Sequence, residues 1–215
     1  MKKTLSWFAL FILLFGNFSF ALDLQSALKL SNDALKTAIS STGSFVQWGN
    51  TTTEDWIISI LHEKGITIHT DWNSFKPNND IRRDEAAKML TLAVPYLPNG
   101  NKTSKASNVS CTFYDENAAW SDLKSIIKES CEKGLFKGSN WKFNPEKSIT
   151  NAQLLTVLWR MLYGMQDETK GHYASKYIAL LEKDWYLDNI SMPQSKWDVA
   201  AERGLLAKLV VRVIE

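Results

Sequence analysis

One stretch, residues 134–162, most constrains what this chain can fold into, because a helix end, a loop and a helix start follow one another in it. It reads GLFKGSNWKFNPEKSITNAQLLTVLWRML. Gly134 lacks a Cβ and suits the left-handed position that ends a helix. Gly138 opens a Gly-Ser-Asn run that predicts a turn, and Thr150 suits the N-cap of a second helix. Four apolar side chains share one face of that helix: Leu154, Leu158, Met161 and Leu162.

The same order recurs elsewhere in the chain, as expected of a repeat protein. Residues 65–94 contain a glycine, then Phe75-Lys76-Pro77 in place of Phe143-Asn144-Pro145, then a helix start at residues 81–85. A third and weaker copy has its second helix starting near Arg203, and residues 192–193 are its candidate for the aromatic-x-Pro element. Three copies in order predict three stacked helix-loop-helix units, because each unit alone leaves an apolar face exposed.

The order GLFKG, WKFNP and ITNAQ resembles the S-layer homology (SLH) repeat, which reads as a helix ending in Gly, an aromatic-Pro loop and an I-T-R-A-E helix start. Asn151 stands where the family usually has Arg. The resemblance implies an all-α fold with three degenerate SLH-like repeats packed as a pseudo-threefold bundle. We place these repeats at residues 51–98, 109–164 and 171–215.

The N-terminus predicts export. Lys2 and Lys3 precede an apolar run, and Ala21 ends a small-residue cleavage pattern, so residues 1–21 are interpreted as a signal peptide. A retained anchor is the alternative, but the run is short for a spanning helix. Residues 22–50 are expected to form an extra amphipathic N-terminal helix and a lead-in. A membrane-surface helix would need a basic polar face that this segment lacks. We therefore expect a secreted protein at the cell surface or envelope, with membrane contact only through the signal peptide before cleavage.

Charge and motif content exclude several functions. The formal net charge of +2 falls to about zero once residues 1–21, with two lysines and no acids, are removed. Such a chain lacks the basic footprint of a nucleic-acid-binding protein. The three histidines form no H-E-x-x-H pattern, and no P-loop or G-x-S-x-G motif is present. We predict no enzyme, no cofactor, no metal site and no nucleic-acid partner. A glycan hydrolase would need two carboxylates at a set separation, which a sequence does not give.

Cys111 and Cys131 are the two cysteines of the chain. An even count in an exported protein favours a disulfide, which would join residues 110–113, expected to be strand-like, to the end of a helix. Two buried thiols are the alternative.

The resemblance also implies a ligand, since SLH domains bind secondary cell-wall polysaccharide, often pyruvylated, with the Arg of I-T-R-A-E at a groove. Carried over by position, Arg83 and Arg203 would hold the acidic ligand, while Asn151 would bond without charge. A guanidinium fork matches a carboxylate in geometry. The alternative for Arg83 is a surface residue paired with Asp80 or Asp84.

Two tryptophans and a glycine complete the expected glycan contacts. Trp72 and Trp141 precede the two Phe-x-Pro elements, where an indole could stack on a sugar ring, although capping of the core edge is the alternative. Gly138 lies in the turn of the second copy. Trp56, Trp120 and Trp159 are expected in the core, because they fall on or beside apolar stripes.

The predicted function is therefore a non-catalytic envelope attachment module that binds cell-wall polysaccharide in grooves between repeats. The alternative is a structural or interaction protein that assembles with other envelope proteins through its degenerate repeats.

Overall fold

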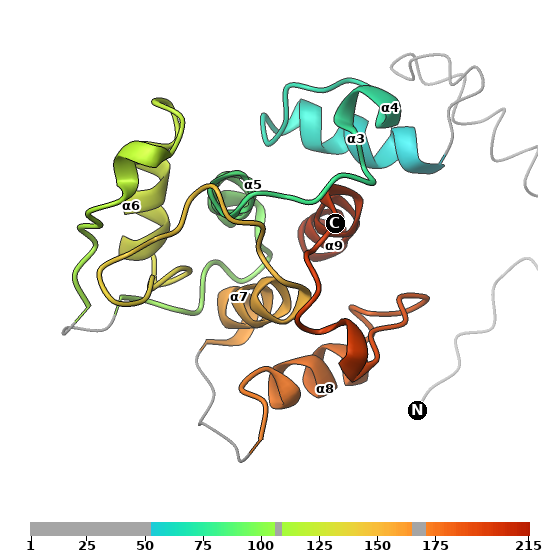
Figure 1. Ribbon diagram of the computed structural model, residues 1–215. Helices are drawn as coiled ribbons and strands as arrows, with labels where there is room; N and C mark the ends of the chain where they lie inside the picture. Colours follow the sequence, from blue (N-terminus) through green and yellow to red (C-terminus); the bar gives the residue numbers. More distant parts are fainter. Residues whose placement is uncertain (1–52, 106–108, 165–170) are drawn as a thin grey trace, which may run out of the picture. The chain divides into compact units, whose positions relative to one another are not determined.

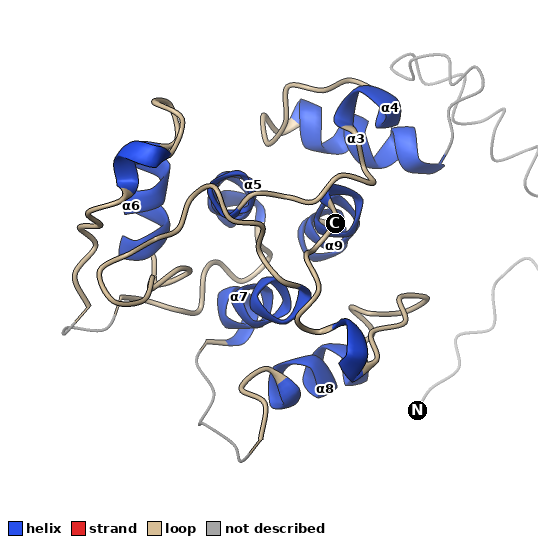
Figure 2. Cartoon of the chain, in the orientation of Figure 1, coloured by secondary structure: helices blue, strands red, loops and turns tan. Residues whose placement is uncertain are grey.

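The computed structural model describes residues 53–105, 109–164 and 171–215. Within these residues the regular structure is helical, with only isolated bridges and no strand (Figures 1 and 2). The predicted all-α fold is thus confirmed. The predicted signal peptide, and the helix and lead-in expected at residues 22–50, lie outside the described residues.

The helices fall into two sets. The three inner helices begin at the I-T-R-A-E-like positions and are α5 (Arg83–Ala93), α7 (Asn151–Tyr163) and α9 (Arg203–Ile214). The three outer helices precede them in the chain and are α3 (Thr53–Glu63), α6 (Lys124–Glu132) and α8 (Ser175–Lys183). Short elements complete the set: α4 (Trp72–Phe75), and the 3-10 turns η1 (Val94–Tyr96), η2 (Glu116–Ala118) and η3 (Gln194–Lys196).

Each outer helix packs on the inner helix of the preceding copy. Helix α6 lies against α5, and α8 lies against α7 (Figure 1). The cycle closes where α3 packs on α9, although the two helices are at opposite ends of the described chain. A sequence copy is therefore not a separate compact unit, because each copy buries its first helix against another copy's second helix.

A ring of three backbone hydrogen bonds joins the segments that enter the inner helices. Ile81 N donates to Ala201 O at 2.9 Å, Ala201 N donates to Ile149 O at 2.8 Å, and Ile149 N donates to Ile81 O at 3.1 Å. All three side chains are fully buried. The ring relates the three inner helix starts by the same contacts and fixes which residues are equivalent.

The first two backbone N–H groups of each inner helix are satisfied by a loop of another copy rather than by water. Arg83 N and Asp84 N donate to Lys147 O and Pro145 O. At the start of α7, the N–H groups of residues 151 and 152 donate to the carbonyl oxygens of residues 199 and 197. At the start of α9, the N–H groups of residues 203 and 204 donate to the carbonyl oxygens of residues 79 and 77. Pro77, Pro145 and Trp197 are thus equivalent, so Trp197, not the pair at residues 192–193, occupies the proline place in the third copy.

The helix ends have the capping and terminating residues that the sequence predicts. The Thr150 side chain accepts from Gln153 N, and Gln153 returns the bond to Thr150 N, which forms a capping box. Gly134, which follows the C-cap residue Lys133 of α6, has φ +77°. Helix α5 ends at Ala93, and a 3-10 turn carries Pro95, as expected where the proline ring removes a donor.

Two of the three tryptophans expected in the core are not there. Trp159 is buried, but Trp56 is 42% exposed and Trp120 is 52% exposed. Trp56 lies beside the buried face of α3, which Ile57, Ile58 and Leu61 form. Trp120 lies outside any helix, and the Arg82 guanidinium covers its ring at 4.6 Å. Periodicity misplaced both because an indole next to an apolar stripe can cover its edge without entering it.

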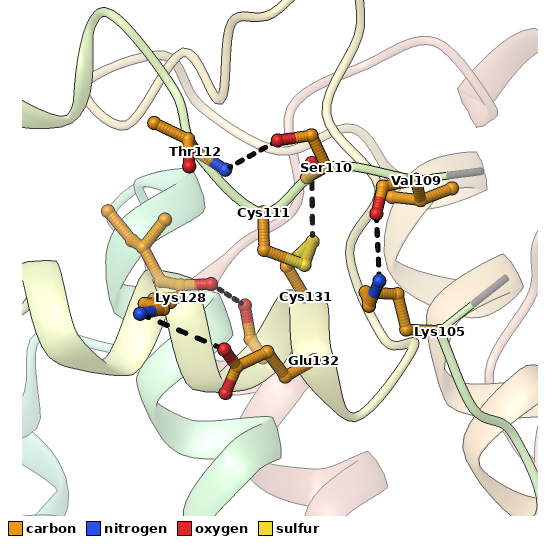
Figure 3. The surroundings of a disulfide bond; sticks show 10 residues. Lys105, Val109, Ser110, Cys111, Thr112, Lys128, Cys131 and Glu132 are labelled. Atoms are coloured by element: carbon orange, nitrogen blue, oxygen red, sulfur yellow. Dashed lines mark hydrogen bonds and ion pairs between the residues drawn. A yellow bond between two sulfur atoms is a disulfide. The ribbon is translucent and has the colours of Figure 1, made fainter. Parts of the chain in front are cut away.

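Cys111 and Cys131 form the predicted disulfide, with Cα atoms 5.6 Å apart (Figure 3). Cys131 is buried near the end of α6, whereas the Cys111 segment is irregular rather than the expected strand. Lys105 Nζ donates to Val109 O at 3.0 Å beside it. The disulfide holds the segment that leads into the second copy against α6.

Candidate functional site: a cationic cavity at the start of α5

A cavity of about 800 Å³ lies between the start of α5, the loop after α6, and α7. Its lining contains no aspartate or glutamate. It does contain five cationic side chains: Arg83, Lys137, Lys142, Lys147 and Arg160. Convergent cations without an acid create a positive potential that favours an anionic ligand.

The loop that forms one wall of the cavity is held by a carboxylate behind it. Asp115 accepts hydrogen bonds from Phe143 N and Asn144 N, each at 2.8 Å. Asn144 has φ +56°, a left-handed conformation that asparagine tolerates. The Phe143 ring is fully buried. The wall is therefore fixed before any ligand arrives.

Arg83 lines this cavity from the start of α5. Its guanidinium carbon lies 5.0 Å from the Phe136 ring centroid and 5.2 Å from that of Phe143, so two aromatic faces hold it. Nη1 donates to Gln153 Oε1 at 3.3 Å. Nε is buried and has no hydrogen-bond partner among the described residues.

No carboxylate of the described chain forms an ion pair with Arg83. The expected alternative, a pair with Asp80 or Asp84, is not what the structure shows: Asp84 is bound instead by Arg82, with Nη2 2.8 Å from Oδ2. Burial lowers the pKa of the Arg83 guanidinium to about 10. The group still carries its charge at neutral pH, so a partly buried cation faces the cavity without a counter-charge among the described residues.

Arg203, the second arginine predicted to bind the ligand, forms an ion pair within the protein. Arg203 starts α9 at the place equivalent to Arg83, as its backbone bonds show. Its Nε donates to Phe75 O at 2.9 Å, and Nη1 lies 2.5 Å from Glu85 Oε1. The Arg203 charge is thus compensated within the protein.

The third equivalent residue is Asn151, at the start of α7. It is buried, and its Nδ2 donates to Lys196 O at 2.9 Å. Its Oδ1 has no hydrogen-bond partner among the described residues. None of Arg203, Asn151, Trp72 and Trp141 lines the cavity at Arg83, whereas Gly138 does.

The two predicted stacking tryptophans occupy different environments. Trp72 is part of α4 rather than a loop, is half-buried, and stacks on Phe75 with ring centroids 6.1 Å apart. Trp141 is 68% exposed and has φ +60° in the turn that joins residues 139 and 142. Trp72 and Trp141 thus both precede a Phe-x-Pro element, but only Trp72 lies in a helix.

Several residues of the cavity were missed by sequence reasoning. Lys142 and Lys147 come from the loop NWKFNPEK, where the cations alternate with the residues that build the turn. Tyr173 reaches the cavity from the third copy, and burial raises the pKa of its hydroxyl, which stays neutral and can donate. The cluster of cations in that loop was a usable signal; the place of Tyr173 was not, because it depends on packing between copies.

No group of three or more metal-ligating side chains occurs among the described residues. The described helices also include none with the length and apolar content that a bilayer span requires. A second hollow of about 410 Å³ is lined by Asp184, Trp185, Tyr186, Asp188 and Arg212.

No protein-family model matches the chain. The chain is similar to a cellulosome-anchoring protein of Acetivibrio thermocellus. The two are 31% identical over 158 residues, which is 66% of this chain and 33% of that protein. The chain therefore spans about one third of the length of that relative.

Proposed function

We propose that this protein is a non-catalytic attachment module of the cell envelope, and that it binds an acidic cell-wall polysaccharide in the cavity at Arg83. The observation that carries the proposal is the charge of the partly buried Arg83, which no carboxylate of the described residues compensates. Similarity to a cellulosome-anchoring protein supports an anchoring role at the cell surface.

An anion would satisfy what the cavity leaves unsatisfied. Among the described residues, nothing accepts a hydrogen bond from the buried Arg83 Nε, and no carboxylate forms an ion pair with the guanidinium. A carboxylate on a sugar, such as that of a pyruvate ketal, could bond to the guanidinium edge in a fork. Lys142 and Lys147 line the same cavity and would add attraction for further acidic groups along a polymer.

Sugar hydroxyls would meet a different part of the lining. Tyr173, Ser139 and Ser148 border the cavity and can donate or accept hydrogen bonds. Such a mix of charge and hydroxyl groups suits an acidic polysaccharide better than an apolar molecule.

The test is binding of the purified protein to envelope polysaccharide, before and after chemical removal of pyruvate and other acidic substituents. We expect wild-type protein to sediment with the untreated polymer and Arg83→Gln to bind it at least about tenfold more weakly, since charged hydrogen bonds contribute about 1.5–3 kcal/mol. Arg83→Gln should remain folded, because it removes a partly buried charge that no described carboxylate compensates.

Lys183→Gln is the matched control. It removes one positive charge at the end of α8, from an exposed side chain outside the cavity lining. Equal loss in both variants, or no binding by wild-type protein, would refute the proposed site.

A second function, assembly through protein contacts, is favoured by one observation. The three equivalent positions are not equally equipped, since Asn151 brings no charge and Arg203 is already paired. Self-association measured by light scattering, unchanged by polysaccharide, would support that function over glycan binding.

A further inference from the structure

We propose that the hollow of about 410 Å³ beyond the end of α8 is a second binding site, and that it takes an uncharged sugar ring stacked on Trp185. The lining comes from the residues that follow α8 and from the last turn of α9. No described residue lines both this hollow and the cavity at Arg83. The proposal therefore goes beyond the proposed function and does not depend on it.

Trp185 holds a backbone conformation that glycine holds in the other two copies. Gly65, Gly134 and Trp185 have φ angles of +67°, +77° and +66°. Each of the three donates its N–H to the carbonyl oxygen three residues earlier, and the N–H that follows it donates to the carbonyl five residues before its own position. These bonds make the three places equivalent. A side chain is strained there because its Cβ crowds the backbone, whereas glycine is not.

Burial of the Trp185 indole does not explain why the strain is kept. The side chain is 77% exposed, and among the described residues it makes no aromatic contact and no hydrogen bond. Residues in strained conformations gather at sites where a ligand binds. An exposed and strained indole that lines a hollow is therefore accounted for by a ligand that covers it.

The charged groups of the hollow distinguish it from the cavity at Arg83. Asp184 is the C-cap of α8, as Lys133 is of α6. Four residues further on, Asp188 stands at the place of Lys137. Two carboxylates and one guanidinium line the hollow, whereas the described lining of the cavity has five cations and no acid. An acidic sugar would meet a net negative charge in the hollow, and an uncharged sugar would not be repelled.

The polar lining suits the edge of a sugar ring. A pyranose presents C–H groups on its faces, which pack against an indole, and hydroxyls around its edge. Asp184 and Asp188 carry oxygens that accept hydrogen bonds from such hydroxyls, and Arg212 can donate to them. The Arg212 guanidinium is positioned beside the loop, since its Nη1 donates to Tyr186 O at 2.8 Å. One aromatic face with a few polar groups around it is typical of a small-ligand site.

The experiment uses protein that carries Arg83→Gln, so that the cavity at the start of α5 contributes little. Ligand-observed NMR titration measures binding of two uncharged probes, the β-1,4-linked hexamers of glucose and of N-acetylglucosamine, and of one acidic probe, oligogalacturonate. We expect an uncharged probe to bind, and oligogalacturonate to bind at least about tenfold more weakly. Adding Trp185→Gly should weaken binding of the uncharged probe by at least about tenfold, because the stacking face is lost.

Trp120→Gly is the matched control in the same background. It removes an indole that is 52% exposed and that does not line the hollow, so binding of the uncharged probe should not change. Failure of both uncharged probes to bind, or equal binding with and without Trp185→Gly, would overturn the proposal. Tighter binding of oligogalacturonate than of either uncharged probe would also overturn it. None of these outcomes contradicts the proposed function, which requires Arg83.

A thermal measurement without ligand tests the strain at Trp185. Trp185→Gly should raise the melting temperature by about 1–4 °C, because glycine adopts a positive φ freely and this gain exceeds the added freedom of the unfolded chain. Trp185→Ala keeps a Cβ at the positive φ, so it should weaken probe binding without that rise. A lower melting temperature for Trp185→Gly would show that the indole stabilises the fold and would overturn the proposal.

Discussion

Gly138 should tolerate alanine much less well than Gly65, although both have nearly the same backbone conformation. Their φ angles are +66° and +67°. A Cβ at Gly138 would lie 2.4 Å from Phe113 Cε1 and 2.7 Å from Lys142 O, whereas a Cβ at Gly65 would meet nothing within 4 Å. The pair therefore separates backbone strain from steric overlap.

The expected loss in the free energy of unfolding for each variant follows from backbone strain and steric overlap. A left-handed alanine costs about 1–2 kcal/mol, and this is the whole expected cost of Gly65→Ala. Gly138→Ala adds overpacking of about 1–3 kcal/mol, because Phe113 is buried and its ring packs 5.5 Å from that of Phe143. The Phe113 ring cannot move aside without disturbing the wall of the cavity, so we expect about 2–5 kcal/mol in total for Gly138→Ala.

Urea denaturation at equilibrium measures the difference directly. The two variants should share the wild-type m-value and differ in midpoint, with the lower midpoint for Gly138→Ala. Equal destabilisation of the two variants would refute the reasoning, because it would mean that the contacts of residue 138 add nothing to its φ cost.

Two further predictions concern stability. Replacement of both Cys111 and Cys131 by serine should lower the free energy of unfolding by about 3 kcal/mol, because the bond closes a loop with a separation of 20 residues; urea denaturation measures it, and an unchanged midpoint would contradict it. Burial, and then the nearby charge of Arg203, lower the pKa of His69 below the ordinary histidine value of 6.5. The unfolded chain therefore binds a proton more readily, and the contribution of His69 to stability should be complete above pH 6.5 and decrease as the pH falls through that value. Denaturation midpoints at several pH values should show this dependence for wild-type protein and for His62→Ala, where the imidazole is exposed, and show less of it for His69→Ala; an equal pH dependence in all three would exclude His69 as its source.

Much of the helical architecture could be predicted from local chemistry. Thr150 and Gln153 form the capping box that their spacing suggested, and Gly134 ends α6 as an achiral residue can. Cys111 and Cys131 were paired correctly because two cysteines allow one pairing. The third copy was harder: Trp197 takes a place that proline holds in the other two, and no local rule connects those residue types.

Charge compensation could not be predicted, because it depends on residues that are far apart in the chain. Arg83 and Arg203 stand at equivalent helix starts and look alike in sequence. The partner of Arg83 is the side-chain amide of Gln153, 70 residues away in the chain. The partner of Arg203 is the carboxylate of Glu85, 118 residues away. The alternative for Arg83, a pair with Asp80 or Asp84, is not seen, and Arg82, one residue earlier, binds the Asp84 carboxylate.

The sequence by itself determined the helices, their caps, the disulfide and the positions equivalent to Arg83, since caps, turns and apolar periodicity act within a few residues. Only the tertiary structure decided which helix packs on which, and it brought α3 onto α9 from opposite ends of the described chain. It also decided which arginine keeps an uncompensated charge. The physical reason is that burial and pairing of a charge depend on the groups that surround it in space, and those groups come from another copy of the repeat.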